Sequence, residues 1–329
     1  MADRQNDPSG FLTALGERVL VADGGMGTAL QAHDLTLDDF NNLEGCNEIL
    51  NVTRPDVVSS IYRGYLEAGS DAIETNTFGA NLANLGEYGI EDRIQELAER
   101  GAALAREAAD EYATPDKPRF VLGSMGPGTK LPTLGHAPYT ALRDAYVEQV
   151  TGLLNGGVDV ILVETSQDLL QTKAAVVAAK RAMEATGRKV PIIAQVTVET
   201  TGTMLVGSEI GAALTALEPL GIDLIGMNCA TGPAEMSEHL RVLAEHARIP
   251  LSCMPNAGLP ELGPNGAVYP LQPDELAEAL AEFVRNYGVR LVGGCCGTTT
   301  EHVRAVAEAV RDVEPANRQP EYVPSVSSV

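Results

Sequence analysis

The sequence predicts an α/β protein built as a single-domain (β/α)8 TIM barrel. Short apolar runs alternate with longer amphipathic stretches eight times along the chain, and this alternation is typical of parallel strands joined by crossover helices. The length of 329 residues accommodates such a barrel, which typically needs roughly 250 residues. The apolar runs also stop repeatedly at polar or glycine residues, as expected where a barrel carries its active site. A doubly wound open sheet is the alternative architecture.

The predicted strands are short apolar segments, and the predicted helices are Ala-, Glu- and Arg-rich stretches with a helical repeat of apolar positions. The strands are expected at residues 18–22, 72–75, 119–123, 158–163, 191–196, 224–227, 251–254 and 290–292. The helices are expected at residues 55–68, 89–112, 140–155, 168–186, 210–220, 234–247, 273–287 and 300–313.

The barrel is expected to occupy residues 11–313 as one domain, because no linker divides the chain. Residues 1–10 are polar, and residues 314–329 are rich in Pro, Ser and polar side chains; both ends are expected to be loose. The segment 28–51 is long for a first strand-to-helix connection and contains few helix signals. Loops of that length are usually functional or disordered.

The composition narrows the class of protein. No apolar run is long enough to span a membrane, and the N-terminus lacks a signal-peptide core, so a cytoplasmic location is expected. A formal net charge of -22 argues against nucleic acid or an anionic membrane as a partner. The acidic, Lys-poor composition fits a salt-rich cytoplasm or an ordinary acidic enzyme equally well. No interface pattern indicates an oligomeric state.

The cysteines are the most informative residues. Cys295 and Cys296 are adjacent and follow the last predicted strand, and Cys229 follows the sixth. Strands six and eight flank strand seven, so these three thiols could converge on one ion. Three thiolates with one open position form a zinc site of the catalytic type. Cys253 lies inside a predicted strand and is expected in the core, and Cys46 is expected to be a bystander.

A zinc ion held by three thiolates suggests a reaction at a substrate thiol. A free thiol is mostly protonated at neutral pH, whereas zinc deprotonates a coordinating thiol. The resulting thiolate would attack an activated methyl carbon. A redox role for adjacent Cys295 and Cys296 is less favoured, because it would leave Cys229 unexplained.

Two acidic residues, Asp23 and Glu164, follow predicted strands and could bind the ammonium group of an amino-acid substrate. The alternative is that each caps a helix or holds a loop. The Gly24-Gly25 turn could let backbone N–H groups approach the substrate carboxylate, although glycine turns alone are weak evidence.

Together, these strand-end segments resemble the homocysteine S-methyltransferase family. The most specific are Asn228-Cys229 and, later in the chain, Gly293-Gly294-Cys295-Cys296-Gly297. The other matching segments are residues 23–28, 74–78, 163–165 and 255–260. The resemblance runs from about residue 19 to residue 310 and so covers nearly the whole chain.

The resemblance implies a zinc-containing (β/α)8 barrel that methylates homocysteine to methionine, with Cys229, Cys295 and Cys296 as the zinc ligands. It also implies that Asp23 and Glu164 hold the amino group of homocysteine, with backbone at Gly24 and Gly25 near its carboxylate. Asn76 and Asn228 complete the predicted substrate-binding set.

The methyl donor is the open question. Segments 66–78 and 255–260 resemble the homocysteine-binding module of cobalamin-dependent methionine synthases, which implies methylcobalamin on a separate corrinoid protein. An alternative donor is a sulfonium, either S-methylmethionine or S-adenosylmethionine. A different class of function is a partner subunit that binds zinc and homocysteine without activity of its own. Betaine is disfavoured, because the chain has no Trp to recognise a quaternary ammonium.

Overall fold

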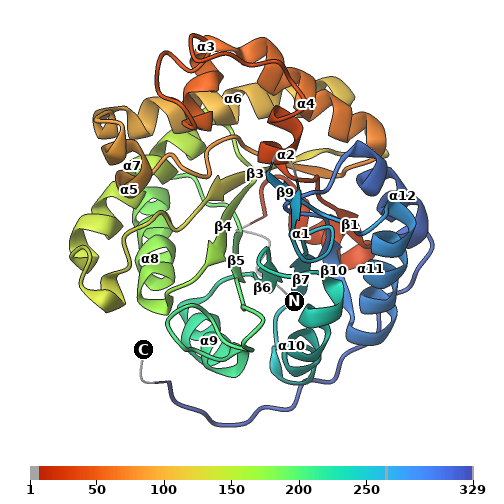
Figure 1. The fold of residues 1–329 in the computed structure, drawn as a ribbon. Helices are drawn as coiled ribbons and strands as arrows, with labels where there is room; N and C mark the ends of the chain where they lie inside the picture. Colours follow the sequence, from red (N-terminus) through yellow and green to blue (C-terminus); the bar gives the residue numbers. More distant parts are fainter. Residues whose placement is uncertain (1–6, 264–265, 328–329) are drawn as a thin grey trace.

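The structure is a computed structural model that describes residues 7–263 and 266–327. The predicted (β/α)8 barrel is confirmed: eight parallel strands form an inner wall, and helices surround them (Figure 1). The strands are β1 (Leu20–Val21), β2 (Ala72–Glu74), β3 (Phe120–Met125), β4 (Val160–Ser166), β5 (Ile192–Val196), β6 (Leu224–Asn228), β7 (Leu251–Met254) and β10 (Val289–Val292).

The strands follow the order β1-β10-β7-β6-β5-β4-β3-β2. Between the two ends of this order, the Asp71 N–H donates to the Val21 carbonyl at 2.6 Å, which brings β2 against β1. All carboxyl ends of the strands therefore lie at one end of the barrel, called the mouth below. The amino ends lie at the opposite end, called the base.

Long helices cover the outside of the barrel. The α-helices are α1 (Phe11–Glu17), α2 (Met26–Leu30), α3 (Leu50–Thr53), α4 (Pro55–Ala68), α5 (Leu82–Glu87), α6 (Ile94–Tyr112), α7 (Tyr139–Gly156), α8 (Leu169–Thr186), α9 (Ile210–Leu217), α10 (Pro233–His246), α11 (Pro273–Tyr287) and α12 (Thr300–Val310). The 3-10 helices are η2 (Asn47–Ile49), η3 (Glu91–Arg93), η4 (Pro132–Leu134) and η5 (Glu218–Leu220).

Helices α4 and α11 coincide with their predicted ranges because the sequence marks both ends. Each begins with proline at its first position and ends before a glycine with positive φ, Gly69 or Gly288. The predicted start of the helix at 89–112 was wrong, because the α-helix α6 begins only at Ile94 and the 3-10 helix η3 precedes it. The short helices α1, α2, α3 and α5 and the hairpin β8 (Glu261–Gly263) with β9 (Gly266–Val268) were not predicted. Such short segments carry too few repeats for a periodic pattern.

The barrel interior is filled by apolar side chains. Phe11 on α1 packs edge-to-face on Phe120 of β3, with ring centroids 5.3 Å apart. Phe11, Leu20, Phe120 and Leu291 are all almost fully buried within one cluster. Helix α1 therefore closes the base of the barrel, which leaves the mouth as the end open to ligands.

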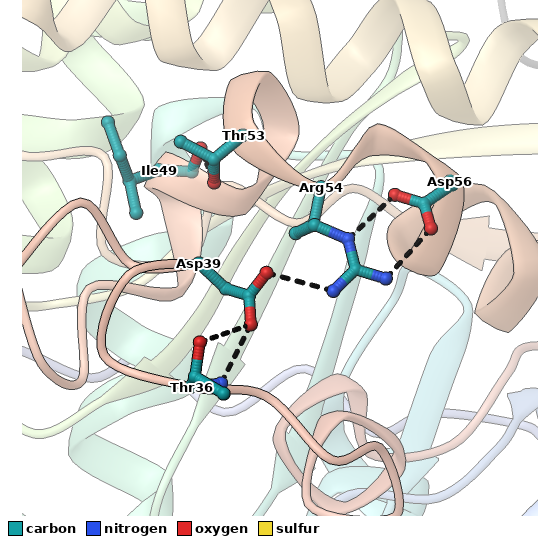
Figure 2. Close-up of polar contacts among 6 residues, drawn as sticks. All are labelled: Thr36, Asp39, Ile49, Thr53, Arg54 and Asp56. Carbon is teal, nitrogen blue, oxygen red and sulfur yellow. Dashed lines mark hydrogen bonds and ion pairs between the residues drawn. The ribbon is translucent and has the colours of Figure 1, made fainter.

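The predicted long connection between the first strand and α4 is ordered. Figure 2 shows the Arg54 guanidinium between two carboxylates, at 2.9 Å from Asp39 and from Asp56. Asp39 also accepts the N–H of Thr36 at 2.7 Å, which closes a tight turn in the loop. These contacts fix the segment that precedes η2, and η2 presents Glu48 to the mouth.

The C-terminal segment crosses the outside of α10 and runs toward α9 (Figure 1). Its described part has no helix or strand, but Arg318 donates to the carbonyls of Ala247 and Ile249 at 2.8 and 2.6 Å. Residues 1–6 of the predicted loose N-terminus and residues 328–329 of the predicted loose tail lie outside the described residues. The domain limits 11–313 stay a prediction. No helix in the described ranges is long and apolar enough to cross a membrane.

Candidate metal centre and adjoining cavity

The three cysteines singled out from the sequence meet at the mouth. The sulfur atoms of Cys229, Cys295 and Cys296 all lie within 4.8 Å of one another, and those of Cys229 and Cys296 are 3.9 Å apart. Within residues 7–263 and 266–327, this is the one cluster of His, Cys, Asp or Glu side chains arranged to hold a metal ion. Cys46 and Cys253 are buried away from the cluster, as expected.

The loop after β10 is held against the loop after β7. The Cys295 N–H donates to the Pro255 carbonyl at 2.8 Å, and the Cys296 N–H donates to Asn256 Oδ1 at 3.0 Å. Gly297 follows with φ of 79°, a conformation that glycine adopts without strain. These bonds fix the direction of both cysteine side chains before any ligand binds.

Three residues at the mouth have positive φ although they are not glycines: Thr165 after the glutamate of β4, and Cys229 and Ala230 after β6. Their φ values are 52°, 59° and 58°. Left-handed backbone costs free energy in residues with a side chain, most of all in β-branched ones, and such strain gathers at functional sites. The turn at Cys229 directs its sulfur toward the cysteines that follow β10.

The thiol cluster fits a zinc ion. Soft sulfur ligands favour zinc, and three of them leave one coordination position open. Hydrogen bonds from Cys229 and Cys295, offset by burial, hold the pKa of Cys296 below its ordinary value. Hydrogen bonds with the other two thiols, followed by burial, raise the pKa of Cys295. The three thiols thus favour a state with one shared negative charge, which a bound cation would balance.

A cavity of about 240 Å³ adjoins the thiols. Its volume suits a ligand of amino-acid size, since drug-sized ligands occupy pockets of roughly 300–1,000 Å³. Its wall contains the three cysteines, and several other residues predicted to bind substrate also line it: Gly24, Gly25, Asn76 and Glu164. The three thiols and these residues therefore border one space.

Three carboxyl groups gather beside this cavity. Glu164 is buried, which raises its pKa to about 7 although Ser124 Oγ donates to it at 2.5 Å. Burial, and then the negative charges of Glu164 and Asp23, raise the pKa of Glu74 well above its usual range. Burial likewise raises the pKa of Asp23. Asp23 Oδ2 accepts the Glu74 N–H at 2.9 Å, whereas its buried Oδ1 has no partner among the described residues.

Among the described residues, no Lys, Arg or His side chain pairs with these carboxyls. Their pKa values are shifted by burial, by hydrogen bonds and by one another's charge. Keeping several acids together in a buried site is unfavourable unless a cation joins them. The arrangement is therefore prepared for a positively charged group such as an ammonium.

Asn228 does not line the cavity in the described structure. Its Oδ1 accepts the Thr165 N–H at 2.7 Å, and its Nδ2 lies 2.8 Å from Thr165 Oγ1 and 3.1 Å from Glu164. The same nitrogen lies 4.0 Å from the Cys295 sulfur. Asn228 thus links the carboxyl group on β4 to the metal centre, and its polar atoms are already engaged.

The other predicted substrate-binding residues are already bonded to, or tightly packed against, neighbouring parts of the protein. The Asn76 Nδ2 donates to the Asn47 carbonyl at 2.8 Å and lies 3.0 Å from Asn51 Oδ1, so this side chain holds the β1–α4 connection. The Gly25 N–H donates to Thr298 Oγ1 at 3.0 Å. Gly24 has no space for a side chain, because a Cβ there would lie 2.8 Å from the same oxygen.

The sequence prediction missed Glu74, Glu48, Ser124 and Thr165 as residues of the cavity wall. Glu74 gave the same signal as Glu164, an acid at the carboxyl end of a buried strand, and could have been included. Glu48 comes from η2 in the long connection, where no sequence pattern indicates which side chains point toward the cavity.

Comparison with known proteins gives consistent results. A model of the homocysteine S-methyltransferase family matches residues 20–310. The chain is 66% identical over 328 residues to methionine synthase of Mycobacterium tuberculosis and 63% identical over 333 residues to that of Mycobacterium leprae. All of this chain is matched in both cases, but it spans only 28% of the length of either relative.

Among solved structures, the metallated form of the Escherichia coli homocysteine methyltransferase MmuM has the same fold. The TM-score is 0.73 at 23% sequence identity, and the match covers 90% of this chain and 99% of that one. The oxidised form of MmuM gives a TM-score of 0.71 at 24% identity, with 90% and 98% covered.

Proposed function

The chain belongs to the homocysteine S-methyltransferase family, and we propose on this basis that it binds homocysteine and presents its thiol for methylation to methionine. The main support for the proposal is that two groups of side chains with different chemistry, called half-sites here, border one small cavity. One half-site is the cluster of three thiols, and the other is the group of uncompensated carboxyls. Homocysteine carries a thiol and an ammonium group, and each would find a complementary partner.

Cys229, Cys295 and Cys296 would hold the zinc ion. When bound, zinc acts as a Lewis acid that keeps a substrate thiol in its nucleophilic thiolate form. The protein supplies the placement: the two loops bonded to each other after β7 and β10 fix Cys295 and Cys296, and the strained turn after β6 fixes Cys229.

Asp23 and Glu164 would hold the ammonium group, and we add Glu74 to this set. Glu74 and Glu164 line the cavity, and Asp23 adjoins them with one unpartnered oxygen. The substrate carboxylate would lie against the backbone near Gly24 and Gly25. Asn76 and Asn228 would act by holding the cavity wall, because their side-chain amides are bonded to the protein.

The methyl donor would be methylcobalamin carried by a corrinoid protein or domain. The identity to methionine synthases, of which this chain spans 28%, supports this choice. Large apolar side chains exposed on loops around the mouth also support a macromolecular donor, since exposed apolar groups mark interaction surfaces. These are Leu37, Phe78, Leu134, Leu205 and Leu262.

The test is a methyl-transfer assay on zinc-loaded protein with homocysteine and parallel donors. Free methylcobalamin, S-methylmethionine, S-adenosylmethionine and betaine are supplied separately, and methionine is measured. We expect methionine from methylcobalamin alone. Methionine from a sulfonium instead would overturn the donor assignment and make the chain a self-sufficient enzyme. Binding of zinc and homocysteine without turnover would support a partner subunit that lacks activity of its own.

A matched pair of variants tests the metal ligands. Cys295→Ala should abolish zinc binding and turnover, whereas Cys253→Ala, which removes a buried thiol outside the cluster, should retain stoichiometric zinc. Zinc content is measured by elemental analysis after dialysis. Full zinc occupancy and turnover in Cys295→Ala would refute the ligand assignment.

A further inference from the structure

Strand β4 carries a β-bulge at Glu164, one of the residues proposed to bind the substrate ammonium group. The register of β4 with β5 shifts between Val163 and Ser166, so that Glu164 and Thr165 stand opposite the single residue Gln195. A bulge changes the direction of a side chain and is common beside functional sites. This irregularity therefore determines where the Glu164 carboxyl points.

The backbone of the bulge is strained at Thr165. Its φ is 52°, and left-handed backbone is unfavourable for a β-branched residue. Without further contacts, Thr165 would relax to a negative φ, and the preceding Glu164 would turn with it. A neighbouring group must therefore hold this conformation in the folded protein.

The side chain of Asn228 makes the required contacts. Its Oδ1 accepts the Thr165 N–H at 2.7 Å, and its Nδ2 lies 2.8 Å from Thr165 Oγ1. Because a backbone N–H can only donate, the atom that faces it must be the amide oxygen, which fixes the orientation of the amide. The Nδ2 then donates to Glu164 Oε2 at 3.1 Å. One side-chain amide thus holds both residues of the bulge.

Asn228 is itself firmly placed. It ends β6, is 1% exposed and pairs with Met254 of β7, and Thr197 Oγ1 donates to its carbonyl at 2.9 Å. The other oxygen of the Glu164 carboxyl accepts the Ser124 hydroxyl at 2.5 Å. The carboxyl is therefore held at one oxygen from β3 and at the other from β6.

We propose that Asn228 is a positioning residue for the substrate, whose side-chain amide holds the strained bulge of β4 and thereby directs the Glu164 carboxyl toward the substrate ammonium group. The inference rests on the proposed function, in which Glu164 binds that group. Asn228 does not line the cavity, whereas Glu164 and Thr165 do, so its effect reaches the substrate through the bulge. Asn228 therefore controls recognition of the ammonium group and not of the thiol.

The experiment compares two ligands of the zinc-loaded protein. One is homocysteine, and the other is 4-mercaptobutanoate, which has the same thiol and carboxylate but lacks the amino group. Calorimetric titration gives the dissociation constants for wild type and Asn228→Ala. We expect Asn228→Ala to bind homocysteine about tenfold more weakly, in line with the loss of a hydrogen bond to a charged group. Its affinity for 4-mercaptobutanoate should equal that of wild type, because the thiol half-site is unchanged.

A second substitution tests the role of the strained backbone. Adding Thr165→Gly to Asn228→Ala should recover much of the lost homocysteine affinity, because glycine adopts a φ of 52° without steric cost. The matched control adds Ala230→Gly to Asn228→Ala. Ala230 also has a positive φ, of 58°, but it lies after β6 and outside the bulge, so this change should recover nothing.

Zinc content is measured first, because the Asn228 Nδ2 also lies 4.0 Å from the Cys295 sulfur. Loss of zinc from Asn228→Ala would assign Asn228 to metal retention and overturn the inference. If Asn228→Ala does not fold, Asn228→Ser takes its place in every comparison, since its shorter side chain cannot reach both residues of the bulge.

Three further results would overturn the inference: unchanged homocysteine affinity, equal losses for the two ligands, or equal recovery with Thr165→Gly and Ala230→Gly. Equal losses would indicate general damage to the cavity, and equal recovery would indicate a general relief of strain. Wild-type protein that binds neither zinc nor homocysteine would instead refute the proposed function on which the inference rests.

Discussion

The two ends of strand β2 carry acids with opposite surroundings. Asp71 precedes the strand at the base, where both of its oxygens bind the Arg18 guanidinium at 2.7 and 2.8 Å and one accepts the Val21 N–H at 3.0 Å. Glu74 ends the strand at the mouth beside Glu164 and Asp23, whose charges oppose its ionisation. Both oxygens of Asp71 are thus bonded, whereas no cation among the described residues pairs with Glu74.

Aspartates also precede other strands at the base, and they accept N–H groups of neighbouring strands. Asp159, just before β4, accepts the Val121 N–H at 2.8 Å, and Asp223, just before β6, accepts the Ile192 N–H at 2.8 Å. In each case, an aspartate joins the start of its own strand to the neighbouring strand. Acids at the base therefore belong to the fold, whereas acids at the mouth remain available to a ligand, in line with the separation of stability from function in such barrels.

The strongest test of this contrast replaces Glu164 with Gln. The change keeps the shape but removes a charge proposed to face the substrate ammonium. Since a hydrogen bond to a charged group is worth about 1.5–3 kcal/mol, homocysteine affinity should fall roughly ten- to a hundredfold. Calorimetric titration of the zinc-loaded protein measures it. Asp71→Asn is the control and should bind homocysteine like wild type; equal affinities in all three proteins would remove Glu164 from the site.

The second test measures stability in the same pair of variants. Asp71→Asn breaks the bidentate ion pair with Arg18, so the free energy of unfolding should fall by about 1.5 kcal/mol. Glu164→Gln should leave stability unchanged or raise it, because it removes a buried acid without a cationic partner. Urea denaturation followed by circular dichroism gives both values. A larger loss in Glu164→Gln than in Asp71→Asn would reverse the assignment of the two ends.

The smallest expected effect is a release of protons on ligand binding. Burial raises the pKa of Glu164 to about 7, so near that pH a fraction of this carboxyl is protonated in the free protein. An ammonium group favours the ionised form and lowers the pKa, so binding releases protons. L-Methionine is the probe, because it has the ammonium group but no thiol proton. Titration in two buffers of different ionisation enthalpy measures the release, which should shrink in Glu164→Gln; proton uptake would contradict the argument.

Much of the candidate site follows from residue type and position in the chain. Alternating apolar runs predict the barrel, because each run must be buried and parallel strands need crossover helices. Once the barrel is predicted, the carboxyl ends of its strands must share one face, so Cys229 and Cys295 can be expected near each other without coordinates. This reasoning extends to the acids at strand ends, including Glu74.

What the sequence by itself determined is the fold and the polar residues at the strand ends, whereas Glu48 reaches the mouth from η2 without a sequence signal. Only the tertiary structure decided which acids are paired, since Asp71 and Glu74 flank the same short strand and look alike in the chain. Their difference depends on Arg18 and Val21, which are distant in sequence and reach only one end of the strand. Local periodicity sets helices and strands, whereas charge pairing and hydrogen bonding depend on groups that only folding brings together.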